Sequence, residues 1–307
     1  MRILLTGASG QVGGVLAKTL AAFGDVVTPG RTAFDLSKID SIPAGLDAIA
    51  PDVIVNPAAY TAVDRAEDEP ELAHRINADA PGAIGRWAAG RKVPVVHFST
   101  DYVFDGSGHT PWREDDVPGP LSVYGNSKLS GEQALRAAAG AHLIVRTSWV
   151  YHQAGTNFLR TIVRLVAERE ELRIVADQFG APTSADTIAD ALAALLRKHD
   201  GSFSALAAAS GGTLHLTASG AASWYDFAVA IVAGLKARGV PVRAKRIVPI
   251  KTSEFPAKAQ RPLNSRLDLT RITKLLGHAM PSWQSVLDGV LDKWPDNAGT
   301  VLNQAPS

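Results

Sequence analysis

The chain has 307 residues, of which 20% are charged, and a formal net charge of +1. The near balance of acids and bases argues against a nucleic-acid surface or an anchor on acidic membranes. The absence of cysteine excludes disulfides and thiolate metal sites. The first residues, MRILLTGASG, are broken by glycine too soon for a signal peptide, and no apolar run could span a membrane, so we expect a cytoplasmic protein.

Short apolar segments in the first half of the chain predict β-strands. They lie at residues 2–6, 25–28, 52–56, 93–99 and 142–149. Their valines, leucines and isoleucines are nearly continuous, as in strands that are covered on both faces. Alanine-rich segments with helical periodicity lie between them, for example at 11–23 and 71–90. This alternation predicts an α/β fold with a doubly wound parallel (Rossmann) sheet, which binds ligands at the carboxyl ends of its strands.

The pattern changes after about residue 150. The later segments predict a helix, a strand with a second helix, and a further strand and helix, at 157–170, 172–199 and 213–239. Residues 257–269 contain proline and arginine and show no periodicity. We therefore expect a Rossmann domain over residues 1–150, to which part of the later chain returns, and a smaller C-terminal α/β substrate domain over 151–295. Residues 296–307 are expected to form a flexible tail.

Glycines separate the first strand from the first helix. The segment TGASGQVG places Gly7, Gly10 and Gly13 at this turn. Glycine lets the turn bend tightly and lets the backbone approach a pyrophosphate, which the free N–H groups of the helix start can bind. In this position the spacing predicts dinucleotide binding, although glycines alone also suit a turn that binds nothing.

The second strand ends at Gly30 and Arg31. A Rossmann fold that is specific for NAD usually has an acidic residue there, whereas an arginine can bind the 2′-phosphate of NADP. Asp35 and Leu36 follow in positions that could flank the adenine. The pattern favours NADPH, and it leaves open both NADH and a surface arginine without a ligand.

Tyr124 and Lys128 lie about one helical turn apart in VYGNSKLSGE, so their side chains can point the same way. A free tyrosine has a pKa of about 10, and a nearby ammonium lowers it towards the range of acid catalysis. Thr100 and Asp101 follow the strand at 93–99, where a hydroxyl would face the cofactor. We predict that Tyr124 donates a proton; the alternative is a plain helix start with an exposed lysine.

These features together resemble the extended short-chain dehydrogenase/reductase family. The shared segments are the glycine loop, NPAAYTAVD (56–64), STDYVFDG (99–106) and YGNSK (124–128). The likeness spans about residues 2–290 and is greatest to the sugar-nucleotide reductases. It implies that Thr100, Tyr124 and Lys128 are catalytic, with Asn77 as a candidate helper.

The resemblance also implies a reaction, which is reduction by NADPH of the 4-keto group of a dTDP-linked deoxy sugar. Tyr124 would protonate the ketone oxygen, Lys128 would lower the tyrosine pKa and bind the ribose, and Thr100 would orient the oxygen. Implied cofactor contacts are Gln11, Val12, Ala59, Tyr60 and Thr61. Implied substrate contacts are Asp101, Trp149, Asn157, Phe158, Gln178, Pro182, Thr183, Arg261, Asn264 and Ser265, with Arg261 on the phosphates.

Several alternatives within the family stay open. Thr100-Asp101-Tyr102 lacks the second acid of the dehydratases, and Gly30–Arg31 does not favour the epimerases that retain NAD. An epimerase, a reductase of another keto sugar and a non-catalytic regulatory relative remain as rivals. No metal-ligand spacing stands out, and we interpret His109 and His215 as structural. We expect a small sugar nucleotide as partner, no nucleic acid and no membrane, with a homodimer left open.

Overall fold

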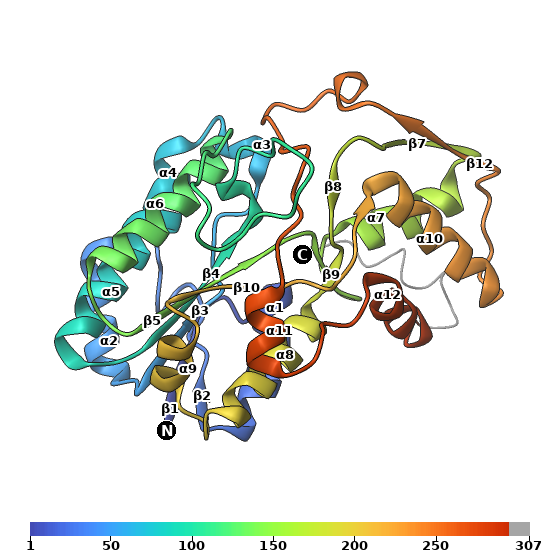
Figure 1. The fold of residues 1–307 in the computed structure, drawn as a ribbon. Coiled ribbons are helices and arrows are strands. Elements are labelled where there is room, and N and C mark those ends of the chain that lie inside the picture. Colours follow the sequence, from blue (N-terminus) through green and yellow to red (C-terminus); the bar gives the residue numbers. More distant parts are fainter. Residues whose placement is uncertain (295–307) are drawn as a thin grey trace.

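A computed structural model of the protein describes residues 1–294, so the predicted tail at 296–307 lies outside the described residues. A parallel sheet of six strands, in the order β10-β5-β4-β3-β1-β2, forms its centre (Figure 1). The strands are β1 (Arg2–Leu5), β2 (Asp25–Val27), β3 (Val53–Asn56), β4 (Val95–Thr100), β5 (His142–Thr147) and β10 (Thr213–His215). This arrangement confirms the predicted doubly wound α/β fold, and β10 comes to the sheet from the second half of the chain.

Helices cover both faces of the sheet because successive side chains of a strand point to opposite sides. Ile3 and Leu5 face one helical layer, whereas Leu4 faces the other. The first layer contains α1 (Gln11–Thr19), α8 (Ala185–Lys198), α9 (Phe203–Ala209) and α11 (Thr270–Leu276). The second contains α2 (Ile42–Ile49), α5 (Ala80–Arg91) and α6 (Val123–Ala137). A short turn η1 (Leu20–Ala22) follows α1, and a second, η2 (Ile39–Ser41), precedes α2.

The helix predicted at 71–90 is interrupted. It consists of α4 (Pro70–His74), a π-helical turn η3 (Arg75–Asp79) and α5. Pro81 has no N–H to donate to the carbonyl four residues earlier, that of Asn77, so the regular helical bonding breaks there. The side chain of Asn77 bonds to residues outside its own helix. It accepts from the backbone N–H of Tyr60 at 2.8 Å and donates to Ser127 Oγ at 2.9 Å. The interruption therefore ties the loop after β3 to α6.

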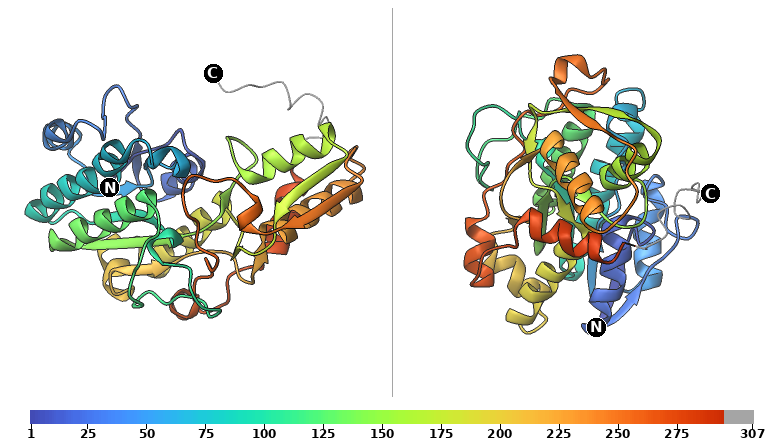
Figure 2. Two further views of the ribbon diagram at one scale, coloured as in Figure 1. Left: turned by 90° about the horizontal axis from the view of Figure 1, so that it is seen from above. Right: turned by 90° about the vertical axis from the view of Figure 1, so that its right-hand side faces the viewer.

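The second half of the chain builds a separate core beside the sheet (Figure 2). Its helices are α7 (Phe158–Glu168), α10 (Trp224–Ala237) and α12 (Trp283–Asp292), and β7 (Glu171–Val175) pairs in parallel with β12 (Arg246–Ile250). Two small sheets lie between the halves, β6 (Val150–Tyr151) with β9 (Thr183–Ser184) and β8 (Phe179–Gly180) with β11 (Ala222–Ser223). The remaining short elements are α3 (Val63–Ala66), η4 (Asp101–Val103) and η5 (Thr252–Glu254). Within residues 1–294, no helix combines the length and apolar character that crossing a membrane requires.

A buried ion pair joins α6 to the sheet. The Arg146 guanidinium of β5 donates from Nε and Nη2 to the two carboxylate oxygens of Glu132 on α6, at 2.9 and 2.7 Å. Both side chains are buried. Although burial acts to raise it, the pKa of Glu132 is lowered by the hydrogen bond and charge of Arg146. The pair holds α6 in register with the carboxyl ends of β4 and β5.

Removing one partner of this pair should destabilise the fold. We expect Arg146→Met to lower the free energy of unfolding by about 3 kcal/mol at pH 7, because Glu132 is then buried with only Arg136 to balance it. The double variant Arg146→Met/Glu132→Gln should regain much of that loss. Urea unfolding followed by circular dichroism measures both, and equal losses in the two variants would contradict this account.

Candidate active site

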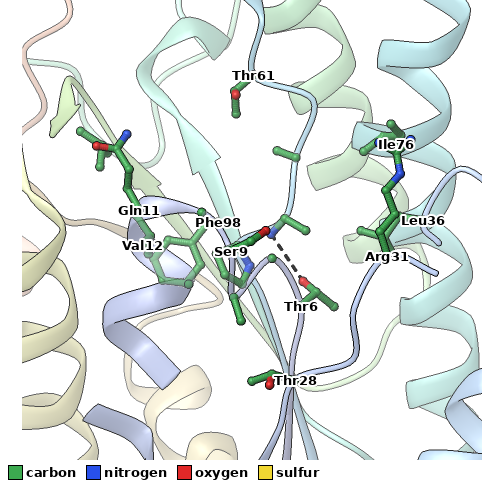
Figure 3. Close-up of a pocket in the computed structure, with 18 of the residues that line it drawn as sticks. Thr6, Ser9, Gln11, Val12, Thr28, Arg31, Leu36, Thr61, Ile76 and Phe98 are labelled. Carbon is green, nitrogen blue, oxygen red and sulfur yellow. Dashed lines mark hydrogen bonds between the residues drawn. The ribbon is translucent and has the colours of Figure 1, made fainter. Parts of the chain in front are cut away.

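A cavity of about 790 Å³ opens at the carboxyl ends of β1 and β3, where the strand order reverses direction. The predicted residues that line it are Gly7, Gly10, Gln11, Val12, Gly13, Arg31, Asp35, Leu36, Ala59, Thr61, Tyr124 and Lys128. Figure 3 shows Arg31 and Leu36 near Ile76 on one side of the cavity, with Gln11, Val12 and Phe98 on the other. The structure thus brings the two predicted motifs, the glycine loop and the tyrosine–lysine pair, to one cavity.

The glycine loop is packed too closely for larger residues. Gly7 has a φ of +61°, and a Cβ there would lie 2.9 Å from the Cα of Ala58. A Cβ on Gly13 would lie 2.1 Å from the carbonyl oxygen of Gly7. The loop can therefore fold back on the start of α1 only with glycine at these two positions, which leaves the backbone exposed to a ligand.

Arg31 stands at the far end of the cavity with its side chain 77% exposed. Its Nε lies 3.7 Å from Asp35 Oδ1. The backbone N–H and the hydroxyl of Ser37 donate to the same carboxylate oxygen, and these bonds hold the pKa of Asp35 below its usual value. Because the ion pair with Asp35 is long and the Arg31 side chain is mostly exposed, the guanidinium can also reach an anion in the cavity.

Tyr124 lies in the first turn of α6, which begins after Ser122, whose Oγ accepts from the Gly125 N–H at 3.1 Å. Burial raises the pKa of Tyr124 to about 12, while a hydrogen bond with Thr100 acts to lower it. This differs from the lowered tyrosine pKa predicted from the sequence. Desolvation of the half-buried phenol outweighs the hydrogen bond with Thr100, and Lys128 directs two of its N–H groups to β4.

Lys128 is buried one turn further along α6 and also lines the cavity. Its Nζ donates to the carbonyl oxygen of Phe98 at 2.6 Å and lies 3.3 Å from His97 Nε2. Burial lowers the pKa of Lys128 to about 8, against the opposing effect of the Glu132 charge. The ammonium is therefore still mostly charged at pH 7, in a position fixed by the end of β4.

Thr100 and Asp101 follow β4 as predicted, and both are buried. The Thr100 hydroxyl donates to Asp101 Oδ1 at 3.0 Å and accepts from the Tyr102 N–H at 3.2 Å. Burial raises the pKa of Asp101 to about 6, despite hydrogen bonds with Ser265 and Thr100. The Thr100 hydroxyl is also a hydrogen-bond partner of the Tyr124 phenol.

The chain resembles known proteins in both sequence and structure. The sequence matches the family described as RmlD substrate binding domain over residues 1–295. The chain belongs to this family. It is 45% identical to the dTDP-4-dehydrorhamnose reductase of Burkholderia thailandensis and 43% identical to that of Escherichia coli (strain K12), with 92% of this chain and 96% and 95% of the relatives covered. A solved dTDP-4-dehydrorhamnose reductase of Bacillus anthracis in complex with NADP has a TM-score of 0.83 at 33% identity, covering 95% of this chain and 99% of that one.

One face of the Trp149 indole is covered in this RmlD-family protein. Its ring stacks on Trp224 with centroids 3.5 Å apart, and a Cβ on Gly180 would lie 2.6 Å from it. Trp149 also has a φ of +48°, in the left-handed region that non-glycine residues rarely adopt. The predicted sugar platform is therefore packed into a pair of tryptophans, of which the sequence pattern indicated only one.

Arg261 was predicted to bind phosphates but pairs with Asp64 of α3. Its Nη2 and Nη1 donate to the two carboxylate oxygens at 2.7 and 3.1 Å, and it does not line the cavity. Backbone N–H groups of Lys258 and Ala259 donate to the same carboxylate. The hydrogen bond from Arg261 is the main cause that lowers the pKa of Asp64. Arg261 therefore fastens the segment that follows η5 to the Rossmann half.

The other predicted substrate contacts mostly hold the scaffold of the second half. Asn157 caps α7 and donates to the side-chain oxygen of Gln11 at 2.8 Å, which joins the two halves. Gln178 accepts from Trp224 Nε1 and donates to the Thr252 hydroxyl, both at 3.1 Å. Three further predicted residues contact neighbouring protein groups: Phe158 packs on Trp224 and Phe227, Thr183 bonds to Ala181 and Ala218, and Asn264 bonds to Ser107, Thr110 and Arg266.

Tyr60 is the one predicted cofactor contact that does not line the cavity, since its hydroxyl donates to Glu69 at 2.8 Å. Lining residues that the sequence analysis missed include Thr6, Ala58, Ile76, Phe98, Ser99, Thr147 and Val150. Most of these stand at the carboxyl end of a strand or just beyond it. That position is the signal that could have identified them.

The glycine loop can be tested with a single methyl group. Gly13→Ala should abolish NADPH binding, because the new Cβ would meet the Gly7 carbonyl and displace the loop. Gly90→Ala is the matched control: it also lies in a helix, but its Cβ would meet nothing within 4 Å. Fluorescence titration with NADPH measures both, and a Gly13→Ala protein that binds as the wild type does would contradict the proposed close packing.

The buried charge of Lys128 should reduce stability at neutral pH. A folded pKa of about 8 against an ordinary value of 10.5 corresponds to a cost of up to about 3 kcal/mol. Because the folded pKa is the lower one, this cost is full below pH 8 and disappears as the pH rises to 10.5. Lys128→Met should therefore be inactive yet more stable than the wild type at pH 7, with the difference shrinking above pH 8. Urea unfolding at pH 7, 9 and 10 tests this, and a less stable variant at pH 7 would refute it.

Proposed function

We propose that this protein reduces the 4-keto group of dTDP-4-dehydro-L-rhamnose with NADPH to form dTDP-L-rhamnose. The proposal rests on one observation above the others: a tyrosine and a lysine from one helix line the same cavity as the glycine loop. The names of the relatives given above support the substrate, and the NADP in the Bacillus anthracis structure supports the cofactor. We further propose that residues 1–150 bind NADPH and residues 151–295 hold the sugar nucleotide.

The cavity suits a dinucleotide phosphate. Gly7 and Gly13 let the loop pack tightly against Ala58 and the start of α1, and the free N–H groups there favour a pyrophosphate. Arg31 presents an exposed guanidinium at the end where a 2′-phosphate would bind. Tyr124 and Lys128 would then stand beside the nicotinamide ribose. NADPH supplies the hydride when it is bound.

Proton transfer in this proposal comes from Tyr124 Oη to the ketone oxygen of the sugar. A phenol with a pKa of about 12 is fully protonated at neutral pH. An alkoxide is far more basic than a phenolate, so this proton moves downhill as negative charge develops on the oxygen. The hydrogen bond with Thr100 aligns the phenol, whose hydrogen goes to the ketone oxygen. Lys128 offers its free N–H to the ribose and its charge to the phenolate that remains.

Following NADPH absorbance tests the reaction. We expect the purified protein to oxidise one NADPH for each molecule of dTDP-4-dehydro-L-rhamnose. Tyr124→Phe should lower kcat by about 10²-fold or more, as is typical when a general acid is lost. The matched control is Tyr151→Phe, which removes a buried hydroxyl that has no hydrogen-bond partner among residues 1–294 and should leave turnover unchanged.

The rival functions give different outcomes in this assay. An epimerase would convert the sugar without net consumption of NADPH. A non-catalytic regulatory relative would bind NADPH without turnover. Either result, or full activity of Tyr124→Phe, would contradict the proposed reaction.

A further inference from the structure

A chain of four buried polar side chains runs beneath the cavity from the glycine loop to Lys128. The Thr6 hydroxyl, after β1, donates to Asn56 Oδ1 at 2.5 Å. Asn56 Nδ2, at the end of β3, lies 3.1 Å from His97 Nδ1 of β4. His97 Nε2 in turn lies 3.3 Å from Lys128 Nζ. All four side chains are buried, and neither Asn56 nor His97 lines the cavity, so neither belongs to the ligand-contacting set described above.

Lys128 has three N–H groups and no acceptor when it is charged. One is given to the Phe98 carbonyl and a second points at His97 Nε2, which leaves the third for the cavity. The two contacts to β4 therefore decide where the remaining N–H can point. A backbone carbonyl accepts in every state, whereas a neutral imidazole accepts only at the nitrogen that carries no proton.

The place of the proton on His97 thus depends on its neighbours. Burial first, and then the charge of Lys128, hold the pKa of His97 well below its usual value, so the ring is neutral and carries one proton. When Asn56 donates to Nδ1, that proton is on Nε2 and faces Lys128, which suits a neutral amine. When the amide of Asn56 is turned by half a rotation, Nδ1–H donates to its oxygen and Nε2 accepts from a charged ammonium. The amide then donates to Thr6, whose hydroxyl hydrogen is released towards the glycine loop.

We propose that His97 is a positioning residue for Lys128. His97 Nε2 accepts a hydrogen bond from the Lys128 ammonium, which keeps the lysine charged and directed at the cofactor. This acceptor requires the amide of Asn56 to be turned over, so that its oxygen accepts from Nδ1–H and its NH2 group faces Thr6, opposite to the orientation given above. The inference rests on the proposed binding of NADPH in the cavity and goes beyond it, because it assigns a role to a histidine that does not line the cavity. Loss of the acceptor makes the ammonium easier to deprotonate, since a charged donor in a dry site has lost a partner.

Lys128 is the group of this cluster whose charge changes between pH 7 and 10. The ionisable groups around it are His97 on β4, Tyr124 and Glu132 on α6, Arg146 on β5 through its pair with Glu132, and Asp101 on η4 through Thr100. On the outer side of α6, η3 contacts it through Asn77, which does not ionise. The pKa of Tyr124 is about 12 and that of Asp101 about 6, so both lie outside this window. The 2′-phosphate of NADPH titrates near pH 6 and is constant as well.

The test is the dissociation constant for NADPH, measured by fluorescence from pH 6.5 to 10 without any sugar. In the wild type, binding should weaken as the pH rises through about 8, where Lys128 loses its proton. His97→Met and His97→Gln replace the ring by unbranched chains of similar length, and only the glutamine retains an acceptor. We expect His97→Met to move the midpoint down by about one pH unit, which corresponds to roughly fivefold weaker binding at pH 8. His97→Gln should restore the midpoint.

His215→Met is the matched control, because His215 is a buried histidine of the same sheet on β10, and its variant should keep the wild-type midpoint. If His97→Met does not fold, His97→Leu takes its place against the same glutamine variant. Equal midpoints in the wild type and the variant without an acceptor would overturn the proposal, as would an equal shift in the glutamine variant. Because no sugar is present, a failure of the proposed reductase reaction would leave this binding result unaffected.

Discussion

The backbone of α6 lies so close to its neighbours that the active site depends on two glycines of this helix. A Cβ on Gly125 would lie 2.3 Å from the carbonyl oxygen of Tyr102, and one on Gly131 would lie 2.0 Å from that of Asn77. These contacts press the helix between η4 and the π-helical turn η3. Tyr124 and Lys128 are carried on the same helix, so the close packing sets their depth at the end of β4.

That depth has an electrostatic consequence. Seated so close to the sheet, α6 buries a lysine and a glutamate in its first three turns. Glu132 is balanced by Arg146, whereas Lys128 has only neutral acceptors at β4. A fully balanced lysine would be more stable but would have no N–H left for a ligand. The site therefore retains a charge that the fold stabilises poorly, as is common where binding requires free polar groups.

The sequence predicted the parts of this site that lie close together along the chain. The strand–helix alternation, the three glycines and the Tyr124–Lys128 spacing each depend on local geometry, and the structure places them as expected at one sheet edge. The pairing of Arg261 with Asp64 and the stacking of Trp149 on Trp224 join residues that are far apart in the chain, so no local pattern indicates them. The raised pKa of Tyr124 was missed for a related reason: spacing shows that a cation is near but not that both groups are dry.

Desolvation also sets the protonation states of Tyr124 and Lys128. Burial moves both Tyr124 and Lys128 towards their neutral forms, with pKa values of about 12 and 8. At pH 7 a phenol with that pKa is ionised in only about one molecule in 10⁵. In the proposed reaction, reduction of the ketone uses the protonated phenol, which is the state that the fold supplies, whereas oxidation of the alcohol would use the rare phenolate as base. In that reaction the resting site is ready to act as an acid, and a lysine charge brought closer to the phenol would stabilise the phenolate that forms. The proposed contact with His97 bears on the chemistry because it directs that charge.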